Sequence, residues 1–271
     1  MSPDVSKSPD DKWLAGDAYE VYMGRWSRRL APAFLEWLRP AHSVNWLEVG
    51  CGTGALTSAI CTSCRPASVV ACDPSAPFVE HARHSLAGAP ATCVVGGADQ
   101  LPHRDDGFEI AVSGLVFNFL PDSGLVLAAI RERLRPGGTV AAYVWDYAEG
   151  MEFLRIFWEE AAALNSGGAD AVDERRRFPL CRQPALAALF QDAGLANVET
   201  AAIEITTDFA NFDDYWSPFL RGTGPAPGYV ASLDPLSRGR LEQRLRERLP
   251  IGDDGGIHLR ARAWAARGVA I

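Results

Sequence analysis

The sequence predicts an α/β protein built on a doubly wound, mostly parallel sheet with helices on both faces. A buried strand leads into a glycine-rich loop and then a helix at residues 46–57. Further apolar runs of strand length follow, separated by helical stretches. The second run ends in Asp73, about 20 residues beyond the loop. Ligands of such sheets bind beyond the carboxyl ends of the strands, so we expect a binding site there.

The first strand and its loop read WLEVGCGTGALT. Glu48 ends the apolar run, and glycines follow at positions 50, 52 and 54. Glycine tolerates positive φ and lets a ligand approach the backbone, while the start of a helix presents unpaired N–H groups. The loop is therefore predicted to hold the polar part of a ligand. The spacing disfavours nicotinamide and flavin enzymes, which show G-x-G-x-x-G, and also a Walker loop, which needs Gly-Lys-Ser/Thr.

The second strand is predicted at Val69 to Cys72, with Asp73 at its end. Pro74 and Ser75 follow, and an amphipathic helix comes next. A carboxylate can accept hydrogen bonds from both hydroxyls of a ribose, and the distance from the glycine loop favours this role for Asp73. The alternative is that Asp73 only caps the next helix.

Three more strands are expected before residue 150. A Pro-Gly-Gly turn at 136–138 precedes the last of them, and the segment around Ala98 and Asp99 should lie beside Asp73 at the carboxyl edge of the sheet. We expect these strands at 91–95, 108–113 and 139–145.

The second half is less regular. An insertion at 208–254 departs from strand patterning and should comprise an aromatic helix, a turn at TGPAPG and a charged helix, together capping the substrate. We therefore expect one domain, with a flexible N-terminus and lid helix at 1–39, a core at 40–207 plus 255–271, and the cap at 208–254. Before and after the cap we expect a helix at 150–164, a polar loop at 169–177, a helix at 184–193 and strands at 198–207 and 256–269.

Composition favours a soluble enzyme. The 271 residues fit one large α/β domain with an insertion. The net charge of −8 argues against a nucleic-acid substrate, which calls for a basic face. No apolar stretch reaches the ~18–20 residues needed to cross a bilayer, and the N-terminus lacks a signal-peptide core. We expect a cytoplasmic protein with no membrane partner, either monomer or homodimer.

The six cysteines are expected to be packing residues rather than metal ligands. Cys61 and Cys64 form a C-x-x-C pair, with His81 and His84 further on. This order loosely imitates a zinc site, but the two histidines are too close together for the usual finger. We therefore expect no metal.

Five motifs in a fixed order carry a family resemblance: LEVGCGTG, CDPS, GADQLP, DGFEIAVS and LRPGGTV. Together they resemble the class I S-adenosylmethionine-dependent methyltransferases, and most closely the small-molecule enzymes related to ubiquinone-biosynthesis methyltransferases. The resemblance covers residues 45–145 closely, and 18–38 and the last strand less specifically. It implies a Rossmann-like sheet of seven strands with the last antiparallel, S-adenosylmethionine as cofactor, and methyl transfer to oxygen, nitrogen or carbon of a small molecule.

The resemblance also implies roles for particular residues. One departure is Gly97, where many relatives carry an aspartate that accepts a bond from the adenine amino group; Asp99 either replaces it or points to water. The methionine part of the cofactor would be held by Glu48, Gly50, Cys51, Gly52, Thr53 and Gly54. The ribose would be bound by Asp73, with Pro74, Ser75 and Phe78 beside it. The adenine would be edged by Ala98, Asp99 and Gln100, and the floor near the sulfonium would be lined by Ser113, Leu115 and Phe117.

Residues 18–38 carry aromatic side chains at near-helical spacing, with arginines between them. The simpler interpretation is an amphipathic helix that covers the sheet. The functional one is a lid, in which Tyr22, Met23 and Trp26 close the pocket and Arg25 or Arg28 pairs with the cofactor carboxylate.

Methyl transfer mainly requires alignment and exclusion of water. A general base helps only where the acceptor must lose a proton. The candidates are Asn118, Asp146 and Tyr147, and less securely His258. Aromatic residues near the expected mouth favour an apolar or planar acceptor, although they could equally be core: Tyr19, Trp26, Phe117, Trp145, Trp158, Trp216, Phe219 and Tyr229.

Two other functions remain open at this stage. A methyltransferase acting on a protein or peptide would need an open acidic groove instead of a capped pocket. A non-catalytic module that binds S-adenosylmethionine would lack an acceptor cavity beside the methyl group.

Overall fold

The computed structural model describes residues 20–164, 166–221 and 224–271. Its centre is a sheet of seven strands: β1 (Asn45–Val49), β2 (Ser68–Asp73), β3 (Ala91–Val95), β4 (Phe108–Gly114), β5 (Leu134–Trp145), β6 (Ala196–Phe209) and β7 (Ile257–Val269). Their order across the sheet is β3-β2-β1-β4-β5-β7-β6. β7 runs antiparallel to both neighbours, and the other pairs are parallel. The predicted fold class, with its antiparallel last strand, is confirmed.

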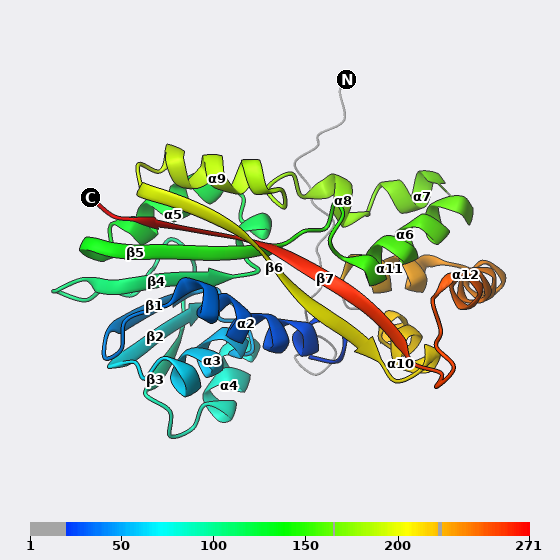
Figure 1. Cartoon of the computed structure of the whole chain (residues 1–271), viewed down its shortest axis with the longest axis horizontal. Coiled ribbons are helices and arrows are strands. Elements are labelled where there is room, and N and C mark those ends of the chain that lie inside the picture. Colours follow the sequence, from blue (N-terminus) through cyan, green and yellow to red (C-terminus); the bar gives the residue numbers. More distant parts are fainter. Residues whose placement is uncertain (1–19, 165, 222–223) are drawn as a thin grey trace.

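Helices cover both faces of this sheet (Figure 1). One side carries α2 (Arg25–Leu38), which follows a π-helical turn η1 (Glu20–Gly24), together with α3 (Ala55–Ser63) and α4 (Ala76–Ser85). The other side carries α5 (Ser123–Arg131) and α9 (Gln183–Asp192). In α2 the buried stripe has a spacing of four residues, Trp26, Leu30, Phe34 and Leu38, because side chains four apart share one helix face.

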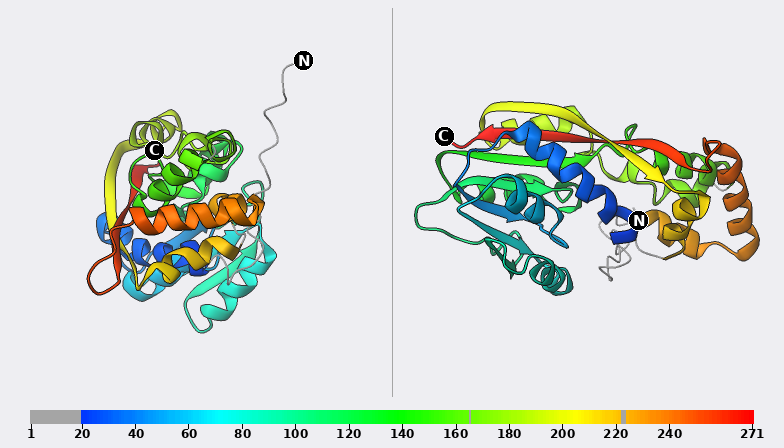
Figure 2. Two further views of the ribbon diagram at one scale, coloured as in Figure 1. Left: turned by 90° about the vertical axis from the view of Figure 1, so that its right-hand side faces the viewer. Right: turned by 60° about the horizontal axis from the view of Figure 1, so that its bottom comes forward.

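The last two strands form a ribbon that is longer than the rest of the sheet. β5 pairs with β7 only from Thr139 to Trp145, whereas the β6–β7 pairing continues to Phe209 opposite Ile257. The free end of this ribbon carries the helical insertion, which Figure 2 shows at one end of the molecule. The insertion comprises α10 (Phe212–Trp216), the 3-10 helix η3 (Ser217–Arg221), α11 (Pro225–Ser232) and α12 (Pro235–Arg248).

The insertion packs on α6 (Glu152–Leu164) to form an aromatic second lobe. The rings of Phe157 and Phe219 stack with centroids 4.6 Å apart and planes 2° apart, and Trp158 packs on Tyr229 at 5.6 Å. This explains why a segment without strand patterning folds here: its apolar side chains find their partners on α6.

Three local expectations were wrong. The predicted loop at 169–177 contains α7 (Ser166–Asp170) and α8 (Glu174–Arg177), the latter capped by the Asp173 carboxylate, which accepts from the Arg175 N–H. Residues 225–228 of the predicted turn begin α11, because proline is accommodated in the first turn of a helix; Thr223 lies outside the described residues. Residues 136–138, which were predicted as a turn before the strand, form a bulge within β5. In the pairing of β4 with β5, Phe108 lies opposite Leu134 and the next pair is Ile110 opposite Thr139.

No helix in the described part of the chain is long and apolar enough to cross a membrane. The same residues contain no cluster of three or more His, Cys, Asp or Glu side chains that could hold a metal ion.

Candidate active site

A cavity of about 810 Å³ opens at the carboxyl ends of β1, β2, β4 and β5. One end is formed by the glycine loop after β1 and by the residues that follow β2. The other end is formed by the segment after β4, the end of β5 and the last turn of α8.

The glycine loop is held against β2 through its backbone. The N–H groups of Gly50 and Cys51 both donate to the Cys72 carbonyl, at 2.8 and 3.0 Å. Gly50 has φ +78°, and a Cβ there would lie 2.4 Å from the Val116 side chain. Gly52 has φ +52° and nothing near the position of a Cβ. Glycine is therefore required at 50 by both conformation and close approach, and at 52 by conformation alone.

Asp73 joins the two loops at this end of the cavity. One carboxylate oxygen accepts from the Gly52 N–H at 2.9 Å, and the other accepts from the Ser75 N–H at 2.9 Å. Burial raises the pKa of Asp73, although both N–H groups act to lower it. Each carboxylate oxygen has a further lone pair, so these bonds leave acceptor capacity for a ligand hydroxyl.

Glu48 is buried at the end of β1 and accepts a 2.6 Å hydrogen bond from the Thr57 hydroxyl. Burial raises its pKa to about 8, because water no longer solvates the charged form. Glu48 and Asp73 are the acidic residues among the described side chains that line the cavity.

The opposite end is aromatic and carries a cation. Tyr143, Trp145 and Tyr147 line it from β5 and the residues beyond, and Phe178 faces them from the end of α8. Arg177 also lines the cavity, with its guanidinium 5.2 Å from the centre of the Phe178 ring.

The predicted site residues divide into three groups. Those that line the cavity are Glu48, Gly50, Cys51, Gly52, Thr53, Asp73, Pro74, Phe78, Ala98, Leu115, Asn118, Trp145 and Tyr147, with Met23 from the lid prediction. Those that lie outside its lining are Tyr22, Arg25, Trp26, Gly54, Ser75, Asp99, Gln100, Ser113, Phe117, Asp146, Trp158, Trp216 and Tyr229. Tyr19 lies outside the described residues.

Several residues of the second group have structural partners that sequence alone cannot reveal. Asp146 is 2% exposed, and its carboxylate accepts from both Arg262 Nε, at 2.8 Å, and a terminal nitrogen of the same guanidinium, at 2.6 Å. The Ser113 hydroxyl donates to the Val49 carbonyl at 2.8 Å. Trp158, Trp216 and Tyr229 are buried in the second lobe.

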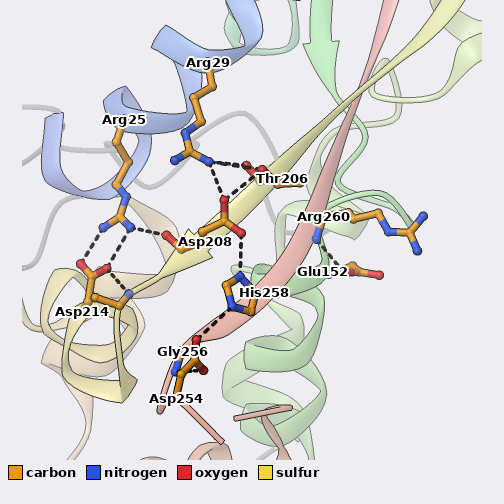
Figure 3. A network of polar contacts seen from close by, with 11 residues as sticks. Arg25, Arg29, Glu152, Thr206, Asp208, Asp214, Asp254, Gly256, His258 and Arg260 are labelled. Atoms are coloured by element: carbon orange, nitrogen blue, oxygen red, sulfur yellow. Dashed lines mark hydrogen bonds and ion pairs between the residues drawn. The ribbon is translucent and has the colours of Figure 1, made fainter. Parts of the chain in front are cut away.

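Two arginines of α2, Arg25 and Arg29, lie outside the cavity lining and reach a polar network at the end of the β6–β7 ribbon (Figure 3). Arg25 forms a two-pronged ion pair with Asp214, at 2.7 and 3.0 Å, and stacks 4.3 Å from the Trp26 ring centre. Arg28 pairs with Glu20 at 2.6 Å. His258 is exposed and bonds Asp208 at 2.9 Å.

Sequence reasoning missed Ser27, Tyr143, Arg177 and Phe178, which line the cavity. Arg177 and Phe178 fall in or beside a segment that was expected to be a loop, and no motif singles them out. The expected cap contributes no described residue to the lining; only Pro225 reaches a small adjoining void.

The match to known proteins agrees with this architecture. Residues 47–142 match a family described as a methyltransferase domain. The malonyl-[acyl-carrier protein] O-methyltransferase of Xylella fastidiosa is 30% identical over 134 residues, which cover 49% of this chain and 42% of that protein. The demethylmenaquinone methyltransferase of Lactiplantibacillus plantarum is 26% identical, with 64% and 78% covered. The match spans about half the length of the first curated relatives, 42% and 57%.

Solved structures share the fold. A putative methyltransferase of Anabaena variabilis gives a TM-score of 0.59 at 16% identity, covering 88% of this chain and 96% of that one. A putative methyltransferase of Haloferax volcanii, solved with its Trm112 activator, gives 0.56 at 21% identity, with 94% and 97% covered. Residues 47–142 therefore form a methyltransferase domain, and the chain is similar to class I S-adenosylmethionine-dependent methyltransferases of the ubiquinone and menaquinone type. Two neighbours of the same fold, phosphoethanolamine N-methyltransferases of Haemonchus contortus at 15% and 16% identity, were solved with S-adenosylhomocysteine and with S-adenosylmethionine, respectively.

Proposed function

We propose that this chain transfers a methyl group from S-adenosylmethionine to a small-molecule acceptor held at the aromatic end of the cavity. The observation that carries the proposal is one continuous cavity that joins the glycine loop to an aromatic wall. Its volume of about 810 Å³ lies in the ~300–1,000 Å³ range of small-molecule sites. A module that only bound the cofactor would not need the second end.

The residues of the loop end fit the cofactor. Glu48 is a buried carboxyl whose pKa is raised to about 8 because water no longer solvates its charged form. The ammonium group of the ligand would stabilise that charged form by ion pairing. Asp73 would accept from the ribose hydroxyls, and Phe78 and Ala98 would flank the adenine. When bound, S-adenosylmethionine supplies a methyl group already activated by the sulfonium.

The chain's own part in the reaction is alignment and exclusion of water. Tyr143, Trp145 and Phe178 would hold an acceptor between aromatic faces, and Met23 on η1 would close the side. Because the lining at this end is aromatic, it favours a small acceptor over the acidic groove that a peptide would need. Relatives are named for malonyl-[acyl-carrier protein], demethylmenaquinone and trans-aconitate, so acceptors differ widely among similar proteins.

The test is isothermal titration calorimetry with S-adenosylmethionine and, separately, NADH, on the wild type and on Asp73→Ala. We expect binding of S-adenosylmethionine alone, weakened at least about tenfold by the substitution. Asp106→Ala, at an exposed position outside the lining, is the matched control. A thermal melt of each variant shows whether the loop anchored by Asp73 stays folded. Absence of binding by the wild type would refute the proposal.

A further inference from the structure

We propose that the methyl acceptor carries a protonated amino group, which binds between Glu174 and Tyr22 while another atom of the acceptor receives the methyl group. The inference rests on the proposed methyl-transfer function and names its substrate class. Three features of the described residues support it: a small void beside the main cavity, a buried hydroxyl without a partner, and a buried carboxyl.

The void adjoins the aromatic end of the main cavity. Its volume is about 10 Å³, close to the ~10–15 Å³ that a single water molecule needs, and an ammonium head group is of similar size. Four residues line both spaces and so lie between them: Met23, Phe119, Tyr147 and Phe178. Phe119, in η2 (Phe117–Phe119), is 40% exposed whereas the other three are buried, so its ring is the one that can turn outward to let a head group pass.

The walls of the void have the chemistry that attracts a cation. Its described lining residues are four with aromatic rings, three that are apolar and one acid, with no basic residue among them: Tyr22, Phe119, Tyr147, Phe178, Met23, Leu154, Pro225 and Glu174. Aromatic faces and a carboxylate both attract a cation, and ammonium ligands are recognised by groups of aromatic rings. An anionic head group would meet the acid, and an apolar one would leave the polar atoms of the void without hydrogen bonds.

Tyr22 supplies the hydroxyl without a partner. It lines the void from η1 and is 4% exposed, and its hydroxyl has no hydrogen-bond partner among the described residues. Burial raises the pKa of Tyr22, and the charge of Glu174 is the next cause, so the two polar groups are close without being bonded. A small donor in the void could bond both of them, which would relieve the cost of the buried unpaired hydroxyl.

Glu174 supplies the negative charge. It is 4% exposed and accepts a hydrogen bond from the Trp158 indole N–H of α6. Burial raises its pKa to about 8 and Asp173 acts in the same direction, while its own backbone N–H, Trp158 and Arg177 act to lower it. Arg177 exerts its effect from outside the lining of the void. Glu174 is therefore mostly neutral at pH 7 in the free protein, and an ammonium group beside it would stabilise its charged form.

The bound amino group is an anchor and not the atom that is methylated. A protonated amine has no lone pair with which to attack the methyl carbon. The reacting atom is therefore another part of the acceptor, which stays in the main cavity beside Tyr143 and Trp145. By holding one end of the acceptor, Glu174 and Tyr22 restrict the motion of the reacting atom at the other end.

The test compares three compounds that share a phenol and differ in the tail. Tyramine carries an amine, 4-ethylphenol carries an apolar group, and 3-(4-hydroxyphenyl)propionate carries an acid. Each is titrated by calorimetry into the full chain in complex with S-adenosylhomocysteine, beside phenethylamine and hexylamine. Turnover with S-adenosylmethionine is followed by S-adenosylhomocysteine release, and the methylated atom is located by mass spectrometry.

The variants separate the charge from the hydroxyl. Glu174→Gln removes the charge, while its amide oxygen can still accept from Trp158. Glu159→Gln is the matched control, because Glu159 is a partly exposed acid of α6 that pairs with Arg155 at 2.9 Å and lines neither space. Tyr22→Phe removes only the unpaired hydroxyl. Affinity for S-adenosylhomocysteine and a thermal melt are measured for every variant, which shows whether each is folded.

We expect tyramine to bind at least about tenfold more tightly than 4-ethylphenol and the propionate. Glu174→Gln should remove most of this preference, and Glu159→Gln should leave it unchanged. Tyr22→Phe should reduce the preference about threefold without lowering the midpoint of the melt, because it deletes a buried polar atom that has no partner. A purely structural Tyr22 would instead affect the melt and not the preference.

Equal or tighter binding of 4-ethylphenol or the propionate would overturn the inference. Failure of all three amines to bind, or a preference for tyramine that survives in Glu174→Gln, would do the same. Methylation of tyramine on its amino nitrogen would contradict the anchoring role. Loss of S-adenosylmethionine binding by the wild type would instead refute the proposed function.

Discussion

At the scale of single residues, Glu48 is a buried acid in the lining of the cavity. It is 1% exposed, bonded to Thr57, and has a pKa of about 8. In the free protein at pH 7 it is therefore mostly protonated. An ammonium group placed beside it would favour the carboxylate and bring its pKa down.

Binding of S-adenosylmethionine at pH 7 should consequently release close to one proton from Glu48. The measured heat will then depend on the ionisation enthalpy of the buffer, which is tested by titrating in phosphate and in Tris. The release should vanish in Glu48→Gln and should fade above pH 9. Equal heats in both buffers for the wild type would show that Glu48 does not meet the ammonium group.

At the scale of elements, the second lobe depends on its aromatic stack. Phe219 is 1% exposed and stacks on Phe157 of α6, with Tyr215 and Tyr22 at 5.3 and 5.4 Å. Phe219→Ala should cost about 3–5 kcal/mol of unfolding free energy in urea denaturation, because the cavity it leaves cannot be refilled. Leu220→Ala, at a side chain that is 52% exposed, should change stability by less than about 0.5 kcal/mol. Equal effects would mean that the lobe is loosely packed.

The polar network in Figure 3 ties α2 to the end of the ribbon. Asp208 accepts from Arg29 at 2.8 Å and bonds His258 at 2.9 Å. Asp208 is the largest cause of the raised pKa of His258, and Asp254 adds a smaller effect. In an NMR titration, Asp208→Asn should return the pKa of His258 toward its ordinary value, and Asp254→Asn should lower it less. The reverse order would show that the Asp208 contact is not kept in solution.

Elements were more predictable than their contacts. The strands and the helices α6 and α9 were expected close to where they lie, because apolar periodicity and glycine or proline boundaries are local signals; β5, however, begins at Leu134 and not at 139. The partners of those elements are not local. Arg25 was expected to meet the cofactor, yet it pairs with Asp214, 189 residues away. α8 was missed because its four residues are polar and carry no apolar periodicity.

At the scale of the whole molecule, two buried acids make stability depend on pH. The folded-state pKa of both Glu48 and Glu174 is about 8, against an ordinary value of 4.5. The folded chain keeps protons that the unfolded chain gives up, so this stability is complete below pH 4.5 and is lost as pH rises through 8.

Urea denaturation at pH 5.5, 7 and 8.5 should therefore show a falling free energy of unfolding. The fall should shrink in Glu174→Gln by an amount on the order of a few kcal/mol, since the amide can still accept from Trp158. Exposed Glu132→Gln should leave the curve unchanged. A flat wild-type profile would mean that neither acid stays buried and protonated.

One end of the cavity could be predicted from the sequence and the other could not. The loop end of the cavity comes largely from contiguous motifs that follow β1 and β2, so many of its lining residues could be named in advance, although Gly54, Ser75, Asp99 and Gln100 lie outside the lining. The acceptor end assembles Asn118, Tyr147, Arg177 and Phe178 from segments that only the folded chain brings together. The prediction that Trp216 and Tyr229 bind the substrate was not matched by the cavity lining, because both side chains are buried in the second lobe and do not line the cavity.

The β6–β7 ribbon gives the chain a natural grafting point. Phe209 and Ile257 are partners across the ladder, so everything between them leaves and re-enters at one place. No described residue between these two lines the main cavity. A protein engineer could replace this stretch with another segment whose two ends lie side by side. The outer shape of the protein would change, while the residues that line the cavity would stay the same.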